Sequence, residues 1–246
     1  MILQNKTVFI TGVGKGIGKS VCEKALQNGA FVYGLTRTAK DIKKIKRHKN
    51  LKIFLGDVNN TKLIKKIFLH SKKNKKKITG LVNNAGIRFR KSFIKINQKE
   101  LKEVFENNYF SIFRLIQEFV RYIGNNNQIN RSIVNVSSIV GKVGFSELSV
   151  YSSTKSALSS LTKSLSKELV SKKIRLNTVS PGFIKTSYYE NFKKKKKLYN
   201  WTLSRIPSKK WGSPEDISEF IVFLLSDKSK YFSGEDISID GGWTNS

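Results

Sequence analysis

Residues 7–18 read "TVFITGVGKGIG", a short apolar run that passes directly into a glycine-rich turn. The apolar run is typical of a buried β-strand, and the segment that begins near Ile17 is typical of a helix. Glycines let a backbone turn sharply and approach a diphosphate closely, while a helix N-terminus presents free N–H groups and a positive dipole end. This order of strand, glycine turn and helix therefore predicts a nucleotide-binding unit at the start of the chain.

Short apolar runs alternate with longer patterned segments along the rest of the chain, which is typical of βαβ units around a parallel sheet. We expect strands at 7–11, 31–36, 51–56, 78–84, 131–138, 174–180 and 236–240. Long helices are expected at 98–122 and after Val150, the second with Leu158, Leu161, Leu165 and Leu169 on one stripe. No compositional break divides residues 1–246, so we predict one Rossmann-type α/β domain: a doubly wound sheet of about seven parallel strands with helices on both faces.

The composition indicates a folded protein without a metal site. A hydrophobic fraction of 39%, including 16 Phe, is enough for a sizeable core. The single cysteine, Cys22, excludes an internal disulfide, and the two histidines lie far from any acid or thiol cluster with metal-ligand spacing. No secretory leader pattern or bilayer-length apolar stretch occurs, so we expect a soluble, cytoplasmic protein that does not associate with membranes.

The chain is strongly basic, with a formal net charge of +30 and lysine runs at 72–77 and 193–197. A nucleic-acid or membrane partner is one explanation for such charge. However, the lysines are spread over most of the chain together with many Asn and Ile and few Ala, as an A/T-rich coding bias produces. No recognition-helix pattern, zinc-finger spacing or aromatic-interleaved basic strand is present, so we expect no nucleic-acid partner.

The helical and strand patterns fail between 183 and 211, a long segment loaded with lysine. Long irregular insertions in compact domains tend to be lids or binding loops. We therefore predict a mobile substrate lid at about 183–211.

The end of the second expected strand distinguishes between the two nicotinamide dinucleotides. An acidic residue there would accept hydrogen bonds from the ribose 2′-hydroxyl, but none occurs from Gly29 to Lys40, and Arg37 stands in about that place. A guanidinium can bind a 2′-phosphate through two hydrogen bonds, and Lys15 could add a second positive charge. NADP(H) is therefore favoured over NAD(H).

Several ordered motifs resemble the short-chain dehydrogenase/reductase family, in its branch of about 250 residues. They are "TGVGKGIG" (11–18), "NNAG" (83–86), Asn108 in "NNYFSIFRLIQ", Ser138 in "VSSIVG", "YSSTK" (151–155), "PGFIKT" (181–186) and the C-terminal "SGEDISIDGGW". The resemblance covers essentially the whole chain. It implies a reductase or dehydrogenase that uses a nicotinamide dinucleotide.

The resemblance also implies roles for individual residues. Its catalytic four match Asn108, Ser138, Tyr151 and Lys155. The cofactor-binding residues that it implies, with the two basic residues named above, are Gly12, Gly14, Lys15, Gly16, Ile17, Gly18, Arg37, Asp57, Val58, Asn83, Ala85, Gly86, Tyr151, Lys155, Pro181, Gly182, Ile184 and Thr186. In this family the tyrosine protonates the developing alkoxide, the serine holds the same oxygen, the lysine holds the nicotinamide ribose, and the asparagine fixes a water behind it.

The spacing of Tyr151 and Lys155 indicates that the lysine influences the pKa of the phenol. Residues four apart on a helix lie about 5 to 6 Å from one another at Cβ. A positive charge at that range can lower the pKa of an acid by about 1 to 3. We therefore expect Lys155 to bring the pKa of Tyr151, ordinarily about 10, toward the working pH, where a general acid is most useful.

Two segments near the expected site indicate different substrate classes. "PGFIKT" and the spacing of the catalytic residues resemble the 3-oxoacyl-[acyl-carrier-protein] reductases, whose partner is an acidic carrier protein that a basic rim would attract. The segment "RFRKSF" after "NNAGI", with Arg88 and Arg90, departs from that group and is more similar to sugar-acid or polyol dehydrogenases. An NADP-dependent sugar or polyol oxidoreductase, of a polysaccharide pathway for instance, is thus the alternative. A basic cofactor-binding interaction protein without turnover is a third. By resemblance we expect a homotetramer formed through the two long helices.

Overall fold

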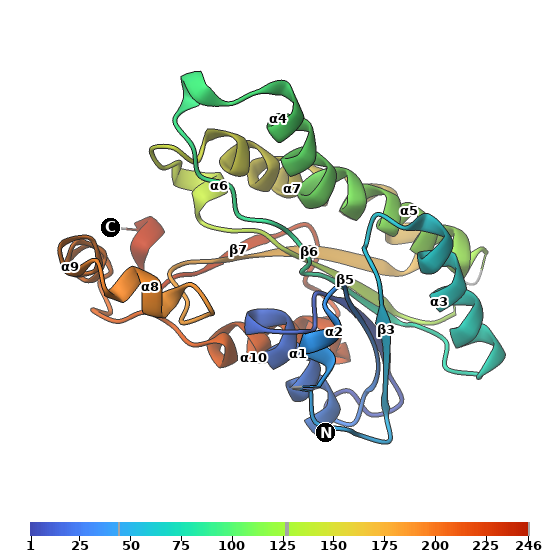
Figure 1. Ribbon diagram of the computed structural model, residues 1–246. Helices are drawn as coiled ribbons and strands as arrows, with labels where there is room; N and C mark the ends of the chain where they lie inside the picture. The colour runs from blue at the N-terminus through green and yellow to red at the C-terminus, as the bar shows by residue number, and fades with distance from the viewer. Residues whose placement is uncertain (44, 126–127, 246) are drawn as a thin grey trace.

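The computed structural model describes residues 1–43, 45–125 and 128–245, and its centre is a parallel sheet (Figure 1). Among the described residues, seven strands pair in the order β3-β2-β1-β4-β5-β6-β7, and every pairing is parallel. The strands are β1 (Thr7–Thr11), β2 (Phe31–Thr36), β3 (Leu51–Leu55), β4 (Gly80–Asn83), β5 (Arg131–Val136), β6 (Ile174–Pro181) and β7 (Asp236–Ile239). The predicted doubly wound sheet is confirmed.

Helices cover both faces of the sheet, because successive strand residues point to opposite sides and both sets are apolar. In β1, Val8 and Ile10 belong to one buried cluster and Phe9 to another. The first cluster includes apolar residues of α1 (Gly16–Gln27) and α10 (Pro214–Leu225). The second includes those of α3 (Thr61–Lys73), α5 (Ser111–Ile123) and α7 (Ser149–Glu168). Figure 1 shows these two helical layers with the sheet between them.

The long helix expected at 98–122 is present with an interruption. It consists of α4 (Gln98–Phe105), a π-helical turn η2 (Glu106–Phe110) and α5. A capping box starts α4, in which the Asn97 side chain accepts from the Glu100 amide and the Glu100 side chain from the Asn97 amide. The second long helix is α7, where Leu158 and Leu161 are buried as the stripe predicts and Leu165 is partly buried. Leu169 is also buried and lies just past the last residue of α7.

The remaining helices are short. They are α2 (Ala39–Ile42), α6 (Val140–Val143), α8 (Tyr189–Lys193) and α9 (Lys196–Arg205), with 3₁₀ turns η1 (Phe93–Lys95), η3 (Val170–Lys172), η4 (Asp227–Ser229) and η5 (Trp243–Asn245). Within the described ranges, no helix has both the length and the apolar character needed to cross a membrane.

The segment 183–211, which lacks periodicity, contains α8 and α9 where the sequence predicts irregular structure. Both helices pack on an aromatic cluster that contains Phe192, Trp211 and, from the C-terminal end of the chain, Trp243. In Figure 1 they lie beside the C-terminus, at the end of the sheet away from the N-terminus. Their order thus comes from long-range packing rather than from a local amphipathic pattern.

The strand order places a binding site at one edge of the sheet. The chain winds outward from β1 through β2 to β3, then crosses back to β4 and continues outward to β7. Ligands of such sheets bind beyond the carboxyl ends of the strands, where this order reverses. In this protein the reversal lies between β1 and β4, the strands that precede the "TGVGKGIG" and "NNAG" motifs.

Candidate active site

The glycine turn after β1 fits a diphosphate group. Gly12 has a φ of 74°, in the left-handed region that favours glycine. A Cβ at Gly18 would lie 2.2 Å from the Gly12 carbonyl oxygen, so only glycine lets the first turn of α1 pack this closely on the end of β1. The start of α1 presents amides without intrahelical partners and the positive end of the helix dipole. An anionic group is the natural ligand of this arrangement.

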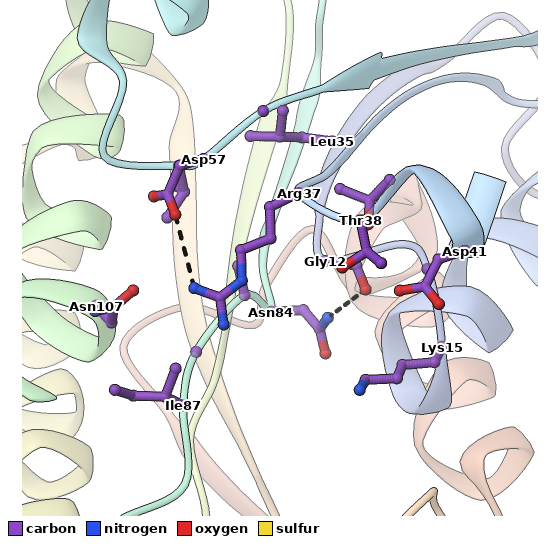
Figure 2. A pocket seen from close by; sticks show the side chains of 16 residues that line it. Gly12, Lys15, Leu35, Arg37, Thr38, Asp41, Asp57, Asn84, Ile87 and Asn107 are labelled. Carbon is purple, nitrogen blue, oxygen red and sulfur yellow. Dashed lines mark hydrogen bonds and ion pairs between the residues drawn. The ribbon is translucent and has the colours of Figure 1, made fainter.

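A cavity of about 270 Å³ opens beside this turn (Figure 2). Eight residues predicted to bind the cofactor line it: Gly12, Gly14, Lys15, Arg37, Asp57, Val58, Ala85 and Gly86. We call it the nucleotide cavity. Its walls come mainly from the loops after β1, β2, β3 and β4, with Asn107 from η2, so the fold gathers residues that are up to 95 positions apart in the sequence, as between Gly12 and Asn107.

Arg37 extends from the end of β2 into the nucleotide cavity, as Figure 2 shows. Its Nη1 lies 3.7 Å from Oδ2 of Asp57, and both side chains are about half-exposed. Such surface ion pairs contribute about 0 to 1 kcal/mol, so a ligand phosphate can compete for the guanidinium. Lys15 and Thr38 lie in the same cavity.

Asp41 is a lining residue that was not predicted, because it lies just past the segment 29–40, which contains no acid. Its Oδ2 lies 2.6 Å from where a Cβ on Gly14 would be, so this carboxylate covers the glycine turn. An acidic residue near the end of β2 is thus visible in the sequence, one position past Lys40.

The two asparagines of "NNAG" have different positions. Asn84 lines the nucleotide cavity, and its Nδ2 donates to the carbonyl oxygens of Thr11, at 3.0 Å, and Gly12, at 3.2 Å. It therefore fixes the glycine turn from the neighbouring loop. Asn83 is fully buried and lines neither this cavity nor the next, and its Nδ2 donates to Asn135 Oδ1 at 2.7 Å. Asn83 thus ties β4 to β5.

Ser138, Tyr151 and Lys155 converge on a second cavity, of about 450 Å³, which we call the reaction cavity. Ser138 follows β5, and its Oγ accepts from the Val140 amide at 3.2 Å. Tyr151 and Lys155 lie one turn apart on α7, with Lys155 Nζ 5.6 Å from the centre of the Tyr151 ring. The Lys155 amine is buried and donates to the Val136 carbonyl oxygen at 2.9 Å. The predicted facing of tyrosine and lysine is present.

The direction expected for the pKa of Tyr151 was wrong. Burial is the largest influence and raises the pKa of this phenol, while the charge of Arg88 and the Ser138 hydroxyl lower it. Burial also lowers the pKa of Lys155 to about 8, because desolvation disfavours its ammonium form. The phenol therefore remains protonated at neutral pH, and Arg88 is the cation that opposes the effect of burial.

Asn108 lies in the π-helical turn η2 and is fully buried. Its Oδ1 accepts from the Ile87 amide at 2.8 Å, and its Nδ2 donates to the Ile87 carbonyl oxygen at 2.9 Å. A weaker contact reaches Thr154 Oγ1 on α7 at 3.3 Å. Asn108 therefore joins the loop after β4 to the helix that carries Tyr151, whereas the adjacent Asn107 lines the nucleotide cavity.

The other predicted residues border the reaction cavity or support the glycine turn. Pro181, Gly182, Ile184, Thr186 and Ile17 line the reaction cavity. Gly16 lies in a shallow hollow beside Thr186 and lines neither cavity. Lys15, Asn84, Gly86 and Ile87 line both cavities, so the two form one continuous cleft along the carboxyl edge of the sheet.

One wall of the reaction cavity is aromatic. Phe145 follows α6, Phe183 follows β6, and Phe192 and Trp211 come from the predicted lid segment. Phe183 is central: its ring centre lies 6.1 Å from that of Phe145 and 5.1 Å from that of Trp211. Such a surface favours an apolar group beside Tyr151.

Comparison with known proteins identifies the family. A family model described as "Enoyl-(Acyl carrier protein) reductase" matches residues 12–244, nearly the whole chain. The chain belongs to the short-chain dehydrogenase/reductase family. A 3-oxoacyl-[acyl-carrier-protein] reductase of Thermotoga maritima is 35% identical over 252 residues, which cover 98% of this chain and 99% of that protein.

Solved structures support the same family and include both nicotinamide dinucleotides. A 4-hydroxyisoleucine dehydrogenase complexed with NADH has a TM-score of 0.91 at 30% identity, over 98% of this chain and 99% of that one. A protein from Agrobacterium tumefaciens described as a 2-deoxy-D-gluconate 3-dehydrogenase, with bound NADP, has a TM-score of 0.87 at 27% identity, over 99% of this chain and 98% of that one. This short-chain dehydrogenase/reductase is thus an oxidoreductase that acts on CH–OH groups with a nicotinamide dinucleotide.

Proposed function

We propose that this protein reduces 3-oxoacyl thioesters, presented by an acyl carrier protein, with NADPH. The observation that carries the proposal is the aromatic wall beside Tyr151 and Ser138, which offers an acyl chain an apolar surface next to the reacting carbonyl. The 35% identity to a 3-oxoacyl-[acyl-carrier-protein] reductase over nearly the whole chain supports this substrate class.

The cofactor would lie along the continuous cleft. The glycine turn and the start of α1 would hold its diphosphate, and Asp57 and Val58 would border its adenine. Arg37 and Lys15 would bind the 2′-phosphate of NADP(H), because both extend into the nucleotide cavity and a guanidinium binds phosphate through two hydrogen bonds. When bound, the cofactor supplies the hydride for the substrate carbonyl carbon.

The residues of the chain supply the proton and hold the substrate. Tyr151 donates its phenolic proton to the carbonyl oxygen as that oxygen gains negative charge, and Ser138 donates a hydrogen bond to the same atom. Because burial raises the pKa of Tyr151, the donor is protonated at neutral pH, as reduction requires. One hydride at carbon and one proton at oxygen complete the alcohol.

Lys155 and Asn108 support this step from behind the phenol. Lys155 would hold the nicotinamide ribose, and its charge steadies the phenolate that remains after proton transfer. Its hydrogen bond to Val136 fixes the amine beside the Tyr151 ring. Asn108 holds the Ile87 backbone and would position a water that returns the proton to the tyrosine.

The proposal has three further parts, which are an acidic carrier protein as partner, a lid over the substrate and a homotetramer. The net charge of +30 favours encounter with an acidic carrier protein. The segment 183–211 contributes Phe192 and Trp211 to the reaction cavity and would close over bound substrate as a lid. Phe110 and Phe113, in the helices predicted to join subunits, are 45% and 36% exposed, which supports burial of this face in a homotetramer.

The test is an NADPH oxidation screen that compares acetoacetyl thioesters, on coenzyme A and on an acyl carrier protein, with keto-sugars of similar size. We expect the highest kcat/KM for the carrier-linked thioester. Preference for a keto-sugar would replace the proposal with a sugar or polyol dehydrogenase. Absence of turnover with every carbonyl compound, despite NADPH binding, would indicate an interaction protein instead.

A further inference from the structure

Arg88 lies in the reaction cavity without a carboxylate partner. It comes directly after Ile87, in the loop that follows β4, and lines the same cavity as Tyr151 and Ser138. Across the described residues, no carboxylate lies within ion-pair distance of its guanidinium. Its contact is instead an aromatic ring, since Cζ lies 4.2 Å from the centre of the Tyr188 ring.

Arg90, two positions along the chain, is held differently. Its Nη2 lies 2.7 Å and its Nε 2.8 Å from Oε2 of Glu147, and it lines neither cavity. Arg88 and Arg90 are two positions apart in the sequence, whereas the structure gives them different surroundings. Two nitrogens of Arg90 are thus engaged by a carboxylate outside the site. Arg88 keeps its five N–H donors available at the cavity where the reaction takes place.

The reaction cavity therefore holds two sets of donors. Tyr151 and Ser138 would both donate to one oxygen, that of the carbonyl to be reduced. Arg88 lines this cavity together with both residues, and its charge lowers the pKa of the Tyr151 phenol. A 3-oxoacyl thioester carries a second carbonyl, the thioester group, separated from the first by one carbon.

We propose that Arg88 is a specificity-determining residue that donates hydrogen bonds to the thioester carbonyl oxygen of the substrate, and that Tyr188 is a positioning residue that holds its guanidinium over the cavity. A planar guanidinium stacks on an aromatic face and keeps its N–H groups free in its own plane. Tyr188 directly precedes α8, so substrate recognition is coupled to the lid segment. This inference rests on the proposed reduction of 3-oxoacyl thioesters.

The test compares two ketones that differ in one group. The first is the acetoacetyl thioester of N-acetylcysteamine, and the second is the thioether ketone in which CH₂ replaces the thioester carbonyl. Arg88→Gln should lower kcat/KM for the thioester about tenfold more than for the thioether ketone, mainly through KM. Arg90→Gln is the matched control, and it should leave both values within about twofold because this residue lies outside the cavities.

Tyr188 provides a second comparison. Tyr188→Phe keeps an aromatic face under the guanidinium and should retain the preference for the thioester, whereas Tyr188→Leu should lose most of it. In addition, Arg88→Gln should move the alkaline limb of the kcat profile to higher pH, because removing a cation beside Tyr151 raises the pKa of the phenol. The Kd of NADPH should be unchanged in every variant.

Equal losses for the two ketones in Arg88→Gln would overturn the assignment, as would no loss for either. A wild-type protein that reduces keto-sugars but neither ketone would overturn the proposed function and this inference together. If the wild-type protein reduces the thioester and Arg88→Gln does so equally well, the proposed function stands and only the role of Arg88 falls.

Discussion

Replacement of Lys155 by methionine should stabilise the protein at neutral pH while it abolishes most of the activity. Burial lowers the pKa of this lysine from 10.5 to about 8, so the folded protein carries a charged ammonium in an environment that disfavours it. Each pKa unit is equivalent to about 1.4 kcal/mol, which gives an upper limit of about 3 kcal/mol for the cost. Removing the buried charge would relieve this cost, but loss of the hydrogen bond to Val136 offsets about 1 kcal/mol of the resulting stabilisation.

The expected net gain for Lys155→Met is therefore about 2 kcal/mol at pH 7, or a rise in Tm of about 4 to 8 °C for a chain of this size. The gain should depend on pH in a defined direction. Between pH 8 and 10.5 the unfolded chain binds more protons at Lys155 than the folded one, so wild-type stability rises with pH relative to the variant. The difference in Tm is thus constant below pH 8 and shrinks above it.

The assay is thermal unfolding followed by circular dichroism, with both proteins at the same concentration and without cofactor, from pH 6 to 10. Other groups titrate equally in the two proteins, so the difference isolates Lys155. A variant that is less stable than wild type at pH 7, or a difference that stays constant up to pH 10, would refute the argument that burial of this charge is costly.

Three further outcomes follow from the same site. Arg37→Gln should raise the KM for NADPH at least tenfold and change the KM for NADH little; equal effects on both would exclude a 2′-phosphate contact at Arg37. With carrier-linked substrate, kcat/KM should fall steeply as salt rises, whereas a small thioester should show no such dependence; parallel salt profiles would exclude electrostatic attraction of the carrier. Trypsin should cut at the exposed lysines 193–197, and NADPH with a substrate analogue should slow this cleavage; unchanged cleavage would contradict lid closure.

The fold could be predicted from the sequence because its signals are local. The apolar strands and the glycine turn after Thr11 need no knowledge of distant residues, and the predicted strand positions match those of the sheet. The segment 183–211 was predicted poorly because α8 and α9 depend on packing against Trp211 and Trp243, which no periodic pattern within the segment reveals.

The sequence indicates which residues form the candidate site, but not their pKa values or ion pairs. Residue spacing placed Tyr151 and Lys155 on one face of a helix, whereas the direction of the phenol's pKa depends on burial, which only the folded chain determines. Likewise, Arg88 and Arg90 look equivalent in the sequence. Their separation comes from Glu147, a carboxylate 57 positions away from Arg90 that pairs with one arginine and not the other.

The most direct test of the central claim is the turnover of Tyr151→Phe with the carbonyl substrate that the wild-type protein reduces fastest. Phenylalanine keeps the ring and removes only the hydroxyl, so the Kd of NADPH should stay within about twofold of wild type. Loss of a general acid should lower kcat by about 10² to 10⁴. A variant that keeps wild-type kcat would contradict the assignment of Tyr151 as the proton donor.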